Sequence, residues 1–531
     1  MDLDSTGHYP SRRSAVLADN VVATSQPLAA QAGLSMLARG GNAVDAALAA
    51  AIALTVVEPT GNGIGGDAFA IVWDGAALHG LNASGRAPQA WTPERFAGLA
   101  TMPERGWEAV TVPGAVSAWV ALSDRFGRLP FADLFAPAIG YAERGFLVSP
   151  VIAALWRRAE GLLAGQPGFA ETFLPQGRAP KAGERFASPG HARSLRLIAE
   201  TGGEAVYRGA LADEIAGCAR AHGGALTVED LAAHRADWCG TLSQRFDGAV
   251  LHEIPPNSQG IAALIALGIL DHTPIRDFGP DDPRALHLQI EATKCALRAA
   301  EAYVADPDHM SAVGAADLLD GDYLAARARA IDPDRAQDFG AGPVRPGGTV
   351  YLAAADASGM MVSFIQSNYA GFGSGVVVPG TGISLQNRGA GFSLDPASPN
   401  VVGPGKRPFH TIIPGFLMGP DGPLMSFGVM GGPMQPQGHV QMMLRTQLWG
   451  QNPQTAADAP RWRVTEGLGV ACETAIDPAT LDWLSARGHR IVLEAPDAAF
   501  GFGGAQLVGR MPGGGYAAGS DPRKDGCAVG M

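Results

Sequence analysis

The chain has 531 residues, of which 47% are hydrophobic and 17% charged, so it is long enough to bury a large core. Its net charge of −12 argues against nucleic acids and anionic membrane surfaces as partners, because neither attracts an acidic protein. The start lacks the pattern of a secretory signal, and no apolar run is long enough to span a bilayer. These features predict a cytoplasmic protein with five scattered, reduced cysteines: Cys218, Cys239, Cys295, Cys472 and Cys527.

The first elements along the chain are predicted from their end signals. A helix over residues 27–37 stops before two glycines, and Asn42 then caps a second helix over 43–57. A strand follows at 69–73 and ends at a turn.

The middle of the chain is predicted to be helical and the last third rich in strands. Residues 125–340 are expected to be mostly helical, with a long helix over 286–304 whose apolar stripe faces the core. The later elements are strands at 350–355, at 361–366 and near Gly428, and helices at 437–449 and 478–487. This order predicts an α+β fold in which two sheets pack face to face with helices outside.

The junction between these two parts has features of a chain that cuts itself. A linker over 332–346, exposed and cleavable by composition, leads through Gly347 and Gly348 to Thr349, which opens an apolar strand. If the bond before Thr349 breaks, this residue gains a free α-amine beside its hydroxyl, so nucleophile and base lie in one residue. The two glycines permit the strained backbone that such an attack needs. The same segment is also an ordinary strand start, so alone it only suggests self-cleavage.

Other motifs are absent or lie in the wrong context. Residues 61–66 contain a G-x-G-x-x-G pattern, but a helix precedes it and a strand follows, the reverse of a dinucleotide-binding turn. The sequence has no Walker lysine loop, no H-E-x-x-H and no G-x-S-x-G. The twelve histidines do not cluster at metal-ligand spacing, so neither a metal nor another cofactor is expected.

Short motifs follow one another along nearly the whole chain. They lie at residues 40–47, 57–59 and 63–66, at Thr349, and at 372–375, 382–387, 403–408, 431–432, 459–461 and 520–523. In this order they resemble the γ-glutamyltransferase family of N-terminal-nucleophile hydrolases.

The resemblance implies a four-layer αββα sandwich of the N-terminal-nucleophile hydrolase type, made as a proenzyme. Self-cleavage between Gly348 and Thr349 would give a large subunit of residues 1–348 and a small subunit of residues 349–531. The two would form one αββα domain as a heterodimer, with a dimer of heterodimers left open.

The resemblance also implies the catalytic residues. The Thr349 hydroxyl would attack an amide carbonyl and form an acyl-enzyme, which water or an amine then releases. Backbone amides of Gly431 and Gly432 would bind the oxyanion, because glycine allows close approach and each such donor contributes about 3 kcal/mol in a dry site. Ser367 stands where some relatives have a second hydroxyl that holds the nucleophile.

The positions that bind the substrate depart from those of the transpeptidases. Their carboxylate-binding arginine is replaced by Ser84, which leaves Arg86 or Arg388 as the candidate ligand of a substrate carboxylate. Arg86 is equally compatible with a solvated loop position. Their amine-binding aspartate falls at or near Gly391, and no acid occupies 389–391.

Three more substrate-binding positions differ. An asparagine becomes Tyr369, and paired serines become His410 and Thr411. His410 is interpreted either as a pocket residue that assists binding or proton transfer, or as a structural histidine. The connection between Phe392 and Lys406 is shorter than the transpeptidases' lid, which favours water as the acceptor.

These departures predict an amidohydrolase for a γ-glutamyl or other small acidic acyl amide, with water as the main acceptor. A true γ-glutamyl transpeptidase acting on glutathione is an alternative, as are an oxamate amidohydrolase and a glutaryl-type cephalosporin acylase. A third hypothesis is a binding protein that does not process itself. The presence of Thr349 and of the Gly-Gly pair argues against it.

Overall fold

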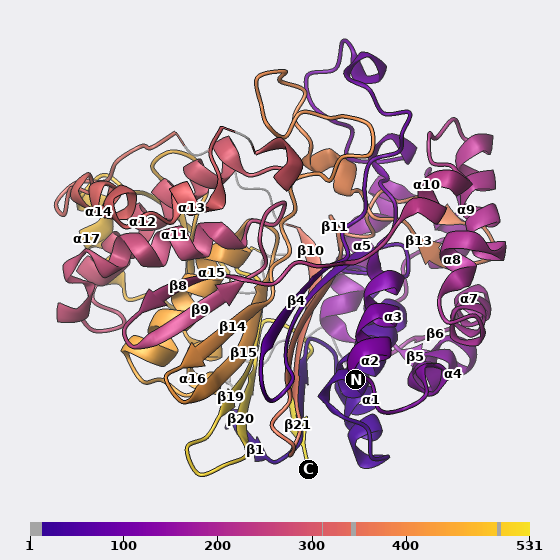
Figure 1. The fold of residues 1–531 in the computed structure, drawn as a ribbon, viewed down its shortest axis with the longest axis horizontal. Coiled ribbons are helices and arrows are strands. Elements are labelled where there is room, and N and C mark those ends of the chain that lie inside the picture. The colour runs from indigo at the N-terminus through magenta and orange to yellow at the C-terminus, as the bar shows by residue number, and fades with distance from the viewer. Residues whose placement is uncertain (1–12, 311, 341–346, 496–500) are drawn as a thin grey trace.

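The computed structural model describes residues 13–310, 312–340, 347–495 and 501–531. Two seven-stranded sheets lie face to face in the middle of the molecule, and helices cover the outer face of each, as Figure 1 shows. The predicted four-layer αββα arrangement is therefore confirmed.

The first sheet is antiparallel and takes strands from both ends of the chain. In spatial order its strands are β1 (Val16–Ala18), β20 (Tyr516–Ser520), β19 (Gly504–Arg510), β15 (Gly422–Met430), β14 (Gly415–Gly419), β9 (Ala249–Glu253) and β8 (Leu242–Phe246).

The second sheet is also antiparallel, and Thr349 lies in one of its strands. Its order is β21 (Cys527–Gly530), β2 (Val21–Thr24), β10 (Gly348–Ala355), β11 (Met361–Tyr369), β3 (Asp67–Trp73), β4 (Leu78–Asn82) and β7 (Asp237–Trp238). A smaller sheet has three strands, β16 (Trp462–Val464), β17 (Gly469–Glu473) and β18 (Arg490–Glu494). Two further strand pairs are β12 (Val377–Val378) with β13 (Ile383–Ser384), and β5 (Phe146–Leu147) with β6 (Arg185–Phe186).

Helices from the first half of the chain cover the second sheet. They are α1 (Pro27–Ala38), α2 (Ala43–Val57), α3 (Ala115–Phe126), α4 (Ala136–Arg144), α5 (Pro150–Leu163), α6 (Phe169–Phe173), α7 (Pro189–Glu200), α8 (Glu204–Arg208), α9 (Ala210–Ala221) and α10 (Val228–Ala233).

A second group of helices lies on the side of the first sheet. This group comprises α11 (Gly260–Asp271), α12 (Pro283–Tyr303), α13 (Ala315–Leu318), α14 (Gly321–Arg329), α15 (Met434–Met443), α16 (Pro453–Asp458) and α17 (Pro478–Ala486). No helix in the described part of the chain has both the length and the apolar character to cross a bilayer.

The core lies in three layers, one between the sheets and one under each helical layer. Between the sheets, Phe69 and Tyr351 pack with Phe416 and Val508. Burying such side chains removes apolar surface from water and holds the sheets together.

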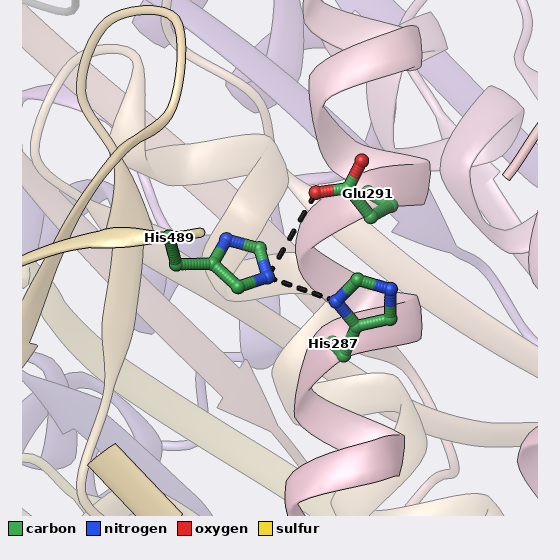
Figure 2. A group of neighbouring side chains, drawn as sticks. All are labelled: His287, Glu291 and His489. Carbon is green, nitrogen blue, oxygen red and sulfur yellow. Dashed lines mark hydrogen bonds and ion pairs between the residues drawn. The ribbon is translucent and has the colours of Figure 1, made fainter. Parts of the chain in front are cut away.

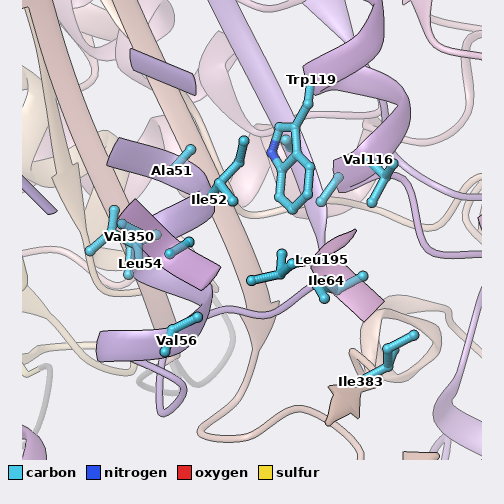
Figure 3. Close-up of a cluster of buried hydrophobic side chains, with 14 of the residues drawn as sticks. Ala51, Ile52, Leu54, Val56, Ile64, Val116, Trp119, Leu195, Val350 and Ile383 are labelled. Carbon is cyan, nitrogen blue, oxygen red and sulfur yellow. The ribbon is translucent and has the colours of Figure 1, made fainter. Parts of the chain in front are cut away.

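Helix α2 is completely buried. All fifteen of its residues are buried, and small alanines let it lie close to β10. Figure 3 shows its side chains beside Val350, with Trp119 from α3 close by. The predicted cap is confirmed as a capping box, in which Asn42 accepts from the amide of Asp45 and the Asp45 carboxylate accepts from that of Asn42.

Several predicted boundaries shift in the structure. Strands β8 and β9 lie within the stretch expected to be mostly helical, and the helix expected over 437–449 is α15 followed by a π-helical turn at Leu444–Leu448. The predicted helices over 27–37 and 286–304 correspond to α1 and α12. Part of the predicted linker, residues 341–346, lies outside the described residues.

Candidate active site

Thr349 lies at the start of β10, next to β11, and is 1% exposed. The pairing of these strands shifts register between Gly348 and Val350, so the ladder is irregular beside Thr349. Its hydroxyl donates to the carbonyl oxygen of Gly348 at 2.7 Å. The side chain that would attack therefore lies against the carbonyl group of the peptide bond predicted to break.

Ser367 bonds to the same carbonyl oxygen as Thr349. Its hydroxyl donates to the Gly348 oxygen at 2.7 Å and lies 3.2 Å from the Thr349 hydroxyl. The amide of Tyr369 donates to Ser367 at 2.8 Å, which orients the serine. Two hydroxyls on one carbonyl oxygen polarise that group and place donors where negative charge would develop during attack.

Gly431 and Gly432 follow β15 and turn the chain beside this site. Their φ angles are +120° and +62°, a region that side chains rarely adopt. A Cβ on Gly347 would lie 3.3 Å from Gly432 Cα and 3.6 Å from its nitrogen. Neither glycine amide donates to any residue that the structure describes. The pair thus offers two main-chain donors next to the segment that precedes the predicted cut.

Arg388 brings a buried positive charge to the site. Its side chain is 1% exposed, lies 4.2 Å from the centre of the Tyr369 ring and donates from Nη1 to Thr411 Oγ1 at 2.9 Å. Its Nε and Nη2 have no hydrogen-bond partner among the described residues. Burial lowers the pKa of Arg388 to about 10, so it stays charged at neutral pH. An unpaired guanidinium edge of this kind matches a carboxylate.

Asp67 and His410 form a buried pair in the same region. Asp67 begins β3 and is the strand partner of Ser367. One carboxylate oxygen accepts from the amides of Gly85 and Gly114, and the other lies 3.1 Å from His410 Nε2. Burial raises the pKa of Asp67 to about 7, although the nearby charge of Arg388 opposes this, and burial holds the pKa of His410 well below its usual value.

Gln259 links the two halves of the site. Its side-chain amide donates both to the Thr411 carbonyl and, at 2.9 Å, to the Gly432 carbonyl. Gln259 also lines a cavity of about 550 Å³, together with Gly391 and Pro433. This cavity lies beside the Gly-Gly turn, where the leaving part of a substrate would need room.

The structure brings most of the predicted site residues together. Thr349 contacts Ser367, and Arg388 contacts Tyr369 and Thr411. His410 bonds to Asp67 and meets Phe69 edge to face, as a buried structural histidine does.

Arg86, by contrast, lies elsewhere. It is bonded to the Asp306 carboxylate at 3.2 Å and to the Gly405 carbonyl, and its side chain is 42% exposed. It lines a separate cavity with Asp230 and His234.

Sequence reasoning missed Asp67 and Gln259. Asp67 could have been noticed as a carboxylate that directly follows a glycine-rich motif and opens a buried strand. Gln259 gave no local signal, because its partners lie more than 150 positions away.

Known proteins resemble this chain over nearly its whole length. A model of the gamma-glutamyltranspeptidase family matches residues 29–531. The chain belongs to this family. Like other members of the γ-glutamyltranspeptidase family, it is an enzyme of the N-terminal-nucleophile hydrolase class.

Two curated relatives and one solved structure of the family span nearly the whole chain. The oxamate amidohydrolase proenzyme of Klebsiella pneumoniae subsp. pneumoniae is 40% identical and covers 95% of this chain and 97% of its own. The acylase ACY 1 proenzyme of Pseudomonas sp. (strain SE83) is 34% identical, with 96% and 93% covered. A cephalosporin acylase from Bacillus halodurans has a TM-score of 0.94 at 49% identity, with 99% and 98% covered.

Proposed function

We propose that the protein is a self-processed amidohydrolase in which Thr349 cleaves the amide of a small acidic acyl group, with water as the main acceptor. The observation that carries this proposal is the contact of the Thr349 and Ser367 hydroxyls with the carbonyl oxygen of Gly348. The relatives named proenzymes support it.

Maturation is proposed to begin with attack of Thr349 Oγ1 on the carbonyl carbon of Gly348. The carbon–nitrogen bond breaks, the hydroxyl proton passes to the Thr349 nitrogen, and an ester joins Gly348 to the threonine oxygen. Water then hydrolyses this ester, which leaves a carboxylate on Gly348 and a free α-amine on Thr349. The products are subunits of residues 1–348 and 349–531.

Cleavage would also make room for a substrate. In the uncleaved chain Gly347 fills the space between the Tyr369 carbonyl and Gly432, since a Cβ there would lie 3.0 Å from that oxygen. When this segment moves away, the gap beside the Gly-Gly turn becomes free. The acyl carbonyl of a substrate would then take the place of the Gly348 carbonyl.

In the mature enzyme the α-amine of Thr349 would take the hydroxyl proton as the oxygen attacks the substrate carbonyl. Amides of Gly431 and Gly432 would bind the oxyanion, and the amine would pass its proton to the leaving nitrogen. Water then releases the acyl group.

The acyl group is proposed to carry one carboxylate and no ammonium group. The free Nε–Nη2 edge of Arg388 supplies a charged fork for the carboxylate. Asp67, the carboxylate nearest to that arginine in the site, is already bonded to two amides and His410, so it offers little to an ammonium. The relative named an oxamate amidohydrolase supports this proposal, because oxamate carries a carboxylate and no ammonium group.

Intact mass spectrometry tests the nucleophile. Wild type should give two fragments that separate between Gly348 and Thr349, Thr349→Ala should remain one chain, and Thr349→Ser should be cut because it keeps the hydroxyl. A wild-type chain that remains uncut, or a Thr349→Ala chain that is cut at the same bond, would contradict self-processing as proposed.

A substrate panel tests the acyl group. The cleaved enzyme should hydrolyse oxamate or a glutaryl amide faster than a γ-glutamyl anilide, because only the last carries an ammonium group. Preference for the γ-glutamyl compound, or transfer to a dipeptide in place of hydrolysis, would favour a transpeptidase.

A further inference from the structure

A second cluster of polar side chains lies far along the chain from Thr349. His287 and Glu291 stand one turn apart on α12, and His489 lies between α17 and β18. All three side chains are buried, with exposures of 1%, 0% and 3%. Figure 2 shows that they converge on one point from the helix and from the loop.

The distances within the cluster are those of a small coordination site. Nδ1 of His287 lies 2.8 Å from Nε2 of His489, and that nitrogen lies 3.9 Å from Oε1 of Glu291. A tetrahedral zinc ion with bonds of about 2.0–2.1 Å holds its ligand atoms about 3.3 Å apart. To reach that spacing the two imidazoles would separate by about 0.5 Å, and the Glu291 carboxylate would approach His489 by about 0.6 Å.

The surroundings of the histidines favour ligation. His287 Nε2 lies 2.8 Å from the carbonyl oxygen of Asp332, and a carbonyl only accepts, so this nitrogen carries the proton. Nδ1 therefore presents its lone pair to the cluster, the arrangement typical of a metal-binding histidine. Without an ion, His489 Nε2 donates to Nδ1 of His287 at 2.8 Å. His489 Nδ1 has no partner among the described residues, so the proton of that ring can move to Nδ1 when an ion takes Nε2.

Glu291 is also held in place. The amide of Gln337 donates to its Oε2 at 3.1 Å, while Lys294 donates to Oε1 at 2.8 Å. The ammonium of Lys294 balances the carboxylate when no ion is bound, and it repels a divalent cation. Lys294 is therefore the internal competitor of an ion at this site.

We propose that His287, Glu291 and His489 form a binding site for Zn²⁺. Two imidazoles and one carboxylate are a ligand set that suits this ion, and water can complete the tetrahedron. His287 also lines a cavity of about 290 Å³ with Trp483 and Arg487, so one member of the cluster borders a cavity. The inference does not depend on the proposed function.

One consequence does rest on the proposed self-cleavage. His287 and Glu291 precede the bond between Gly348 and Thr349, and His489 follows it. A bound ion would therefore join the two subunits of the mature enzyme directly.

Zinc titration of the full chain tests the site. Protein stripped with a chelator should bind one equivalent of Zn²⁺ at pH 7.5 in competition with a chromophoric chelator. His489→Ala and Glu291→Gln should each weaken binding at least about tenfold, because each removes one ligand atom. Lys294→Met should strengthen binding, and His309→Ala, which changes an exposed histidine, should have no effect.

Two readouts separate this site from adventitious binding and from misfolding. Co²⁺ in place of zinc should give the visible spectrum of a tetrahedral site in wild type and not in His489→Ala. Far-ultraviolet circular dichroism should show that His489→Ala and Glu291→Gln fold. If His489→Ala does not fold, His489→Asn replaces it.

The titration is run on wild type and on Thr349→Ala in parallel, so a failure of self-cleavage would not be mistaken for a failure of metal binding. Absence of stoichiometric binding in wild type, or equal affinity in the ligand variants, would overturn the proposal.

Discussion

Arg388 is a buried residue with hydrogen-bond donors that have no partner among the described residues. Its guanidinium is charged at neutral pH, yet two of its donor nitrogens bond to no described residue. Leaving such groups unpaired in a buried place costs free energy, which a bound carboxylate would recover.

Replacing Arg388 should therefore weaken substrate binding more than it slows the chemical step. Arg388→Met should raise KM for a small acidic amide on the order of 100-fold, because two charge-assisted hydrogen bonds are lost. Arg388→Lys keeps the charge but loses the planar fork, so its KM should be intermediate. Steady-state kinetics on a panel with and without the carboxylate measures both effects. An unchanged KM in Arg388→Met would contradict the assignment.

Asp67 should give the enzyme a pH dependence of binding. Its pKa of about 7 means that the carboxyl gains charge as the pH rises from 6 to 8. That charge offsets Arg388 and repels a substrate carboxylate, so KM should be several-fold lower at pH 6 than at pH 8. Asp67→Asn should remove this step in a plot of KM against pH. A step of equal size in Asp67→Asn would assign it to another group.

The Asp67 carboxyl should also make the free energy of unfolding depend on pH. Its pKa is raised from the ordinary 3.8, so the folded state retains a proton that the unfolded chain releases. The free energy of unfolding should therefore fall as the pH rises from about 4 to 7, and Asp67→Asn should make this slope shallower.

At the scale of elements, α2 depends on the start that Asn42 provides. The Asn42 side chain accepts from the amides of Val44 and Asp45, and it donates to the carbonyl of Phe126 at 2.6 Å. It therefore caps one helix and ties it to the end of α3.

Asn42→Ala should lower the free energy of unfolding by about 1–2 kcal/mol, because the cap and the contact to α3 are both lost. Asn42→Ser keeps a capping oxygen and should lose about half as much. Urea unfolding in the Thr349→Ala background, where the chain stays continuous, measures the difference. Equal stability of Asn42→Ala and the parent would show that packing alone holds α2.

The elements that could be predicted from the sequence are those with local signals. Caps and glycines mark the ends of α1, α2 and α17, and the structure places them within about one residue of the prediction. Strands β8 and β9 were missed because β9 pairs with β14, more than 150 positions later, and helical stretches flank them.

The same distinction applies to the candidate site. The contiguous glycines and strand only suggested Thr349, and the resemblance to the family implied its role as the nucleophile. The pair of Asp67 and His410 joins positions 343 apart, and His287 meets His489 across 202 positions. Such contacts depend on how elements far apart in the chain pack together, which one sequence does not reveal.

At the scale of the whole molecule, strands from before and after Gly348 interleave. In the second sheet β10 lies between β2 and β11, and in the first sheet β9 pairs with β14. If the chain is cut there, the two fragments remain joined by ladders of main-chain hydrogen bonds. Separation of the fragments would require unfolding of both sheets.

The pairing of β2 with β21 also brings the two ends of the described chain together. Val21 faces Gly530, and Asn20 exchanges two main-chain hydrogen bonds with Met531, at 3.1 and 3.0 Å. A linker can therefore join residue 531 to the first described residues, near Arg13, and a gene can open at Thr349. In such a circular permutant, removal of the initiator methionine alone exposes the threonine amine. If Thr349 is the nucleophile as proposed, such a permutant would be active without any cleavage of a peptide bond.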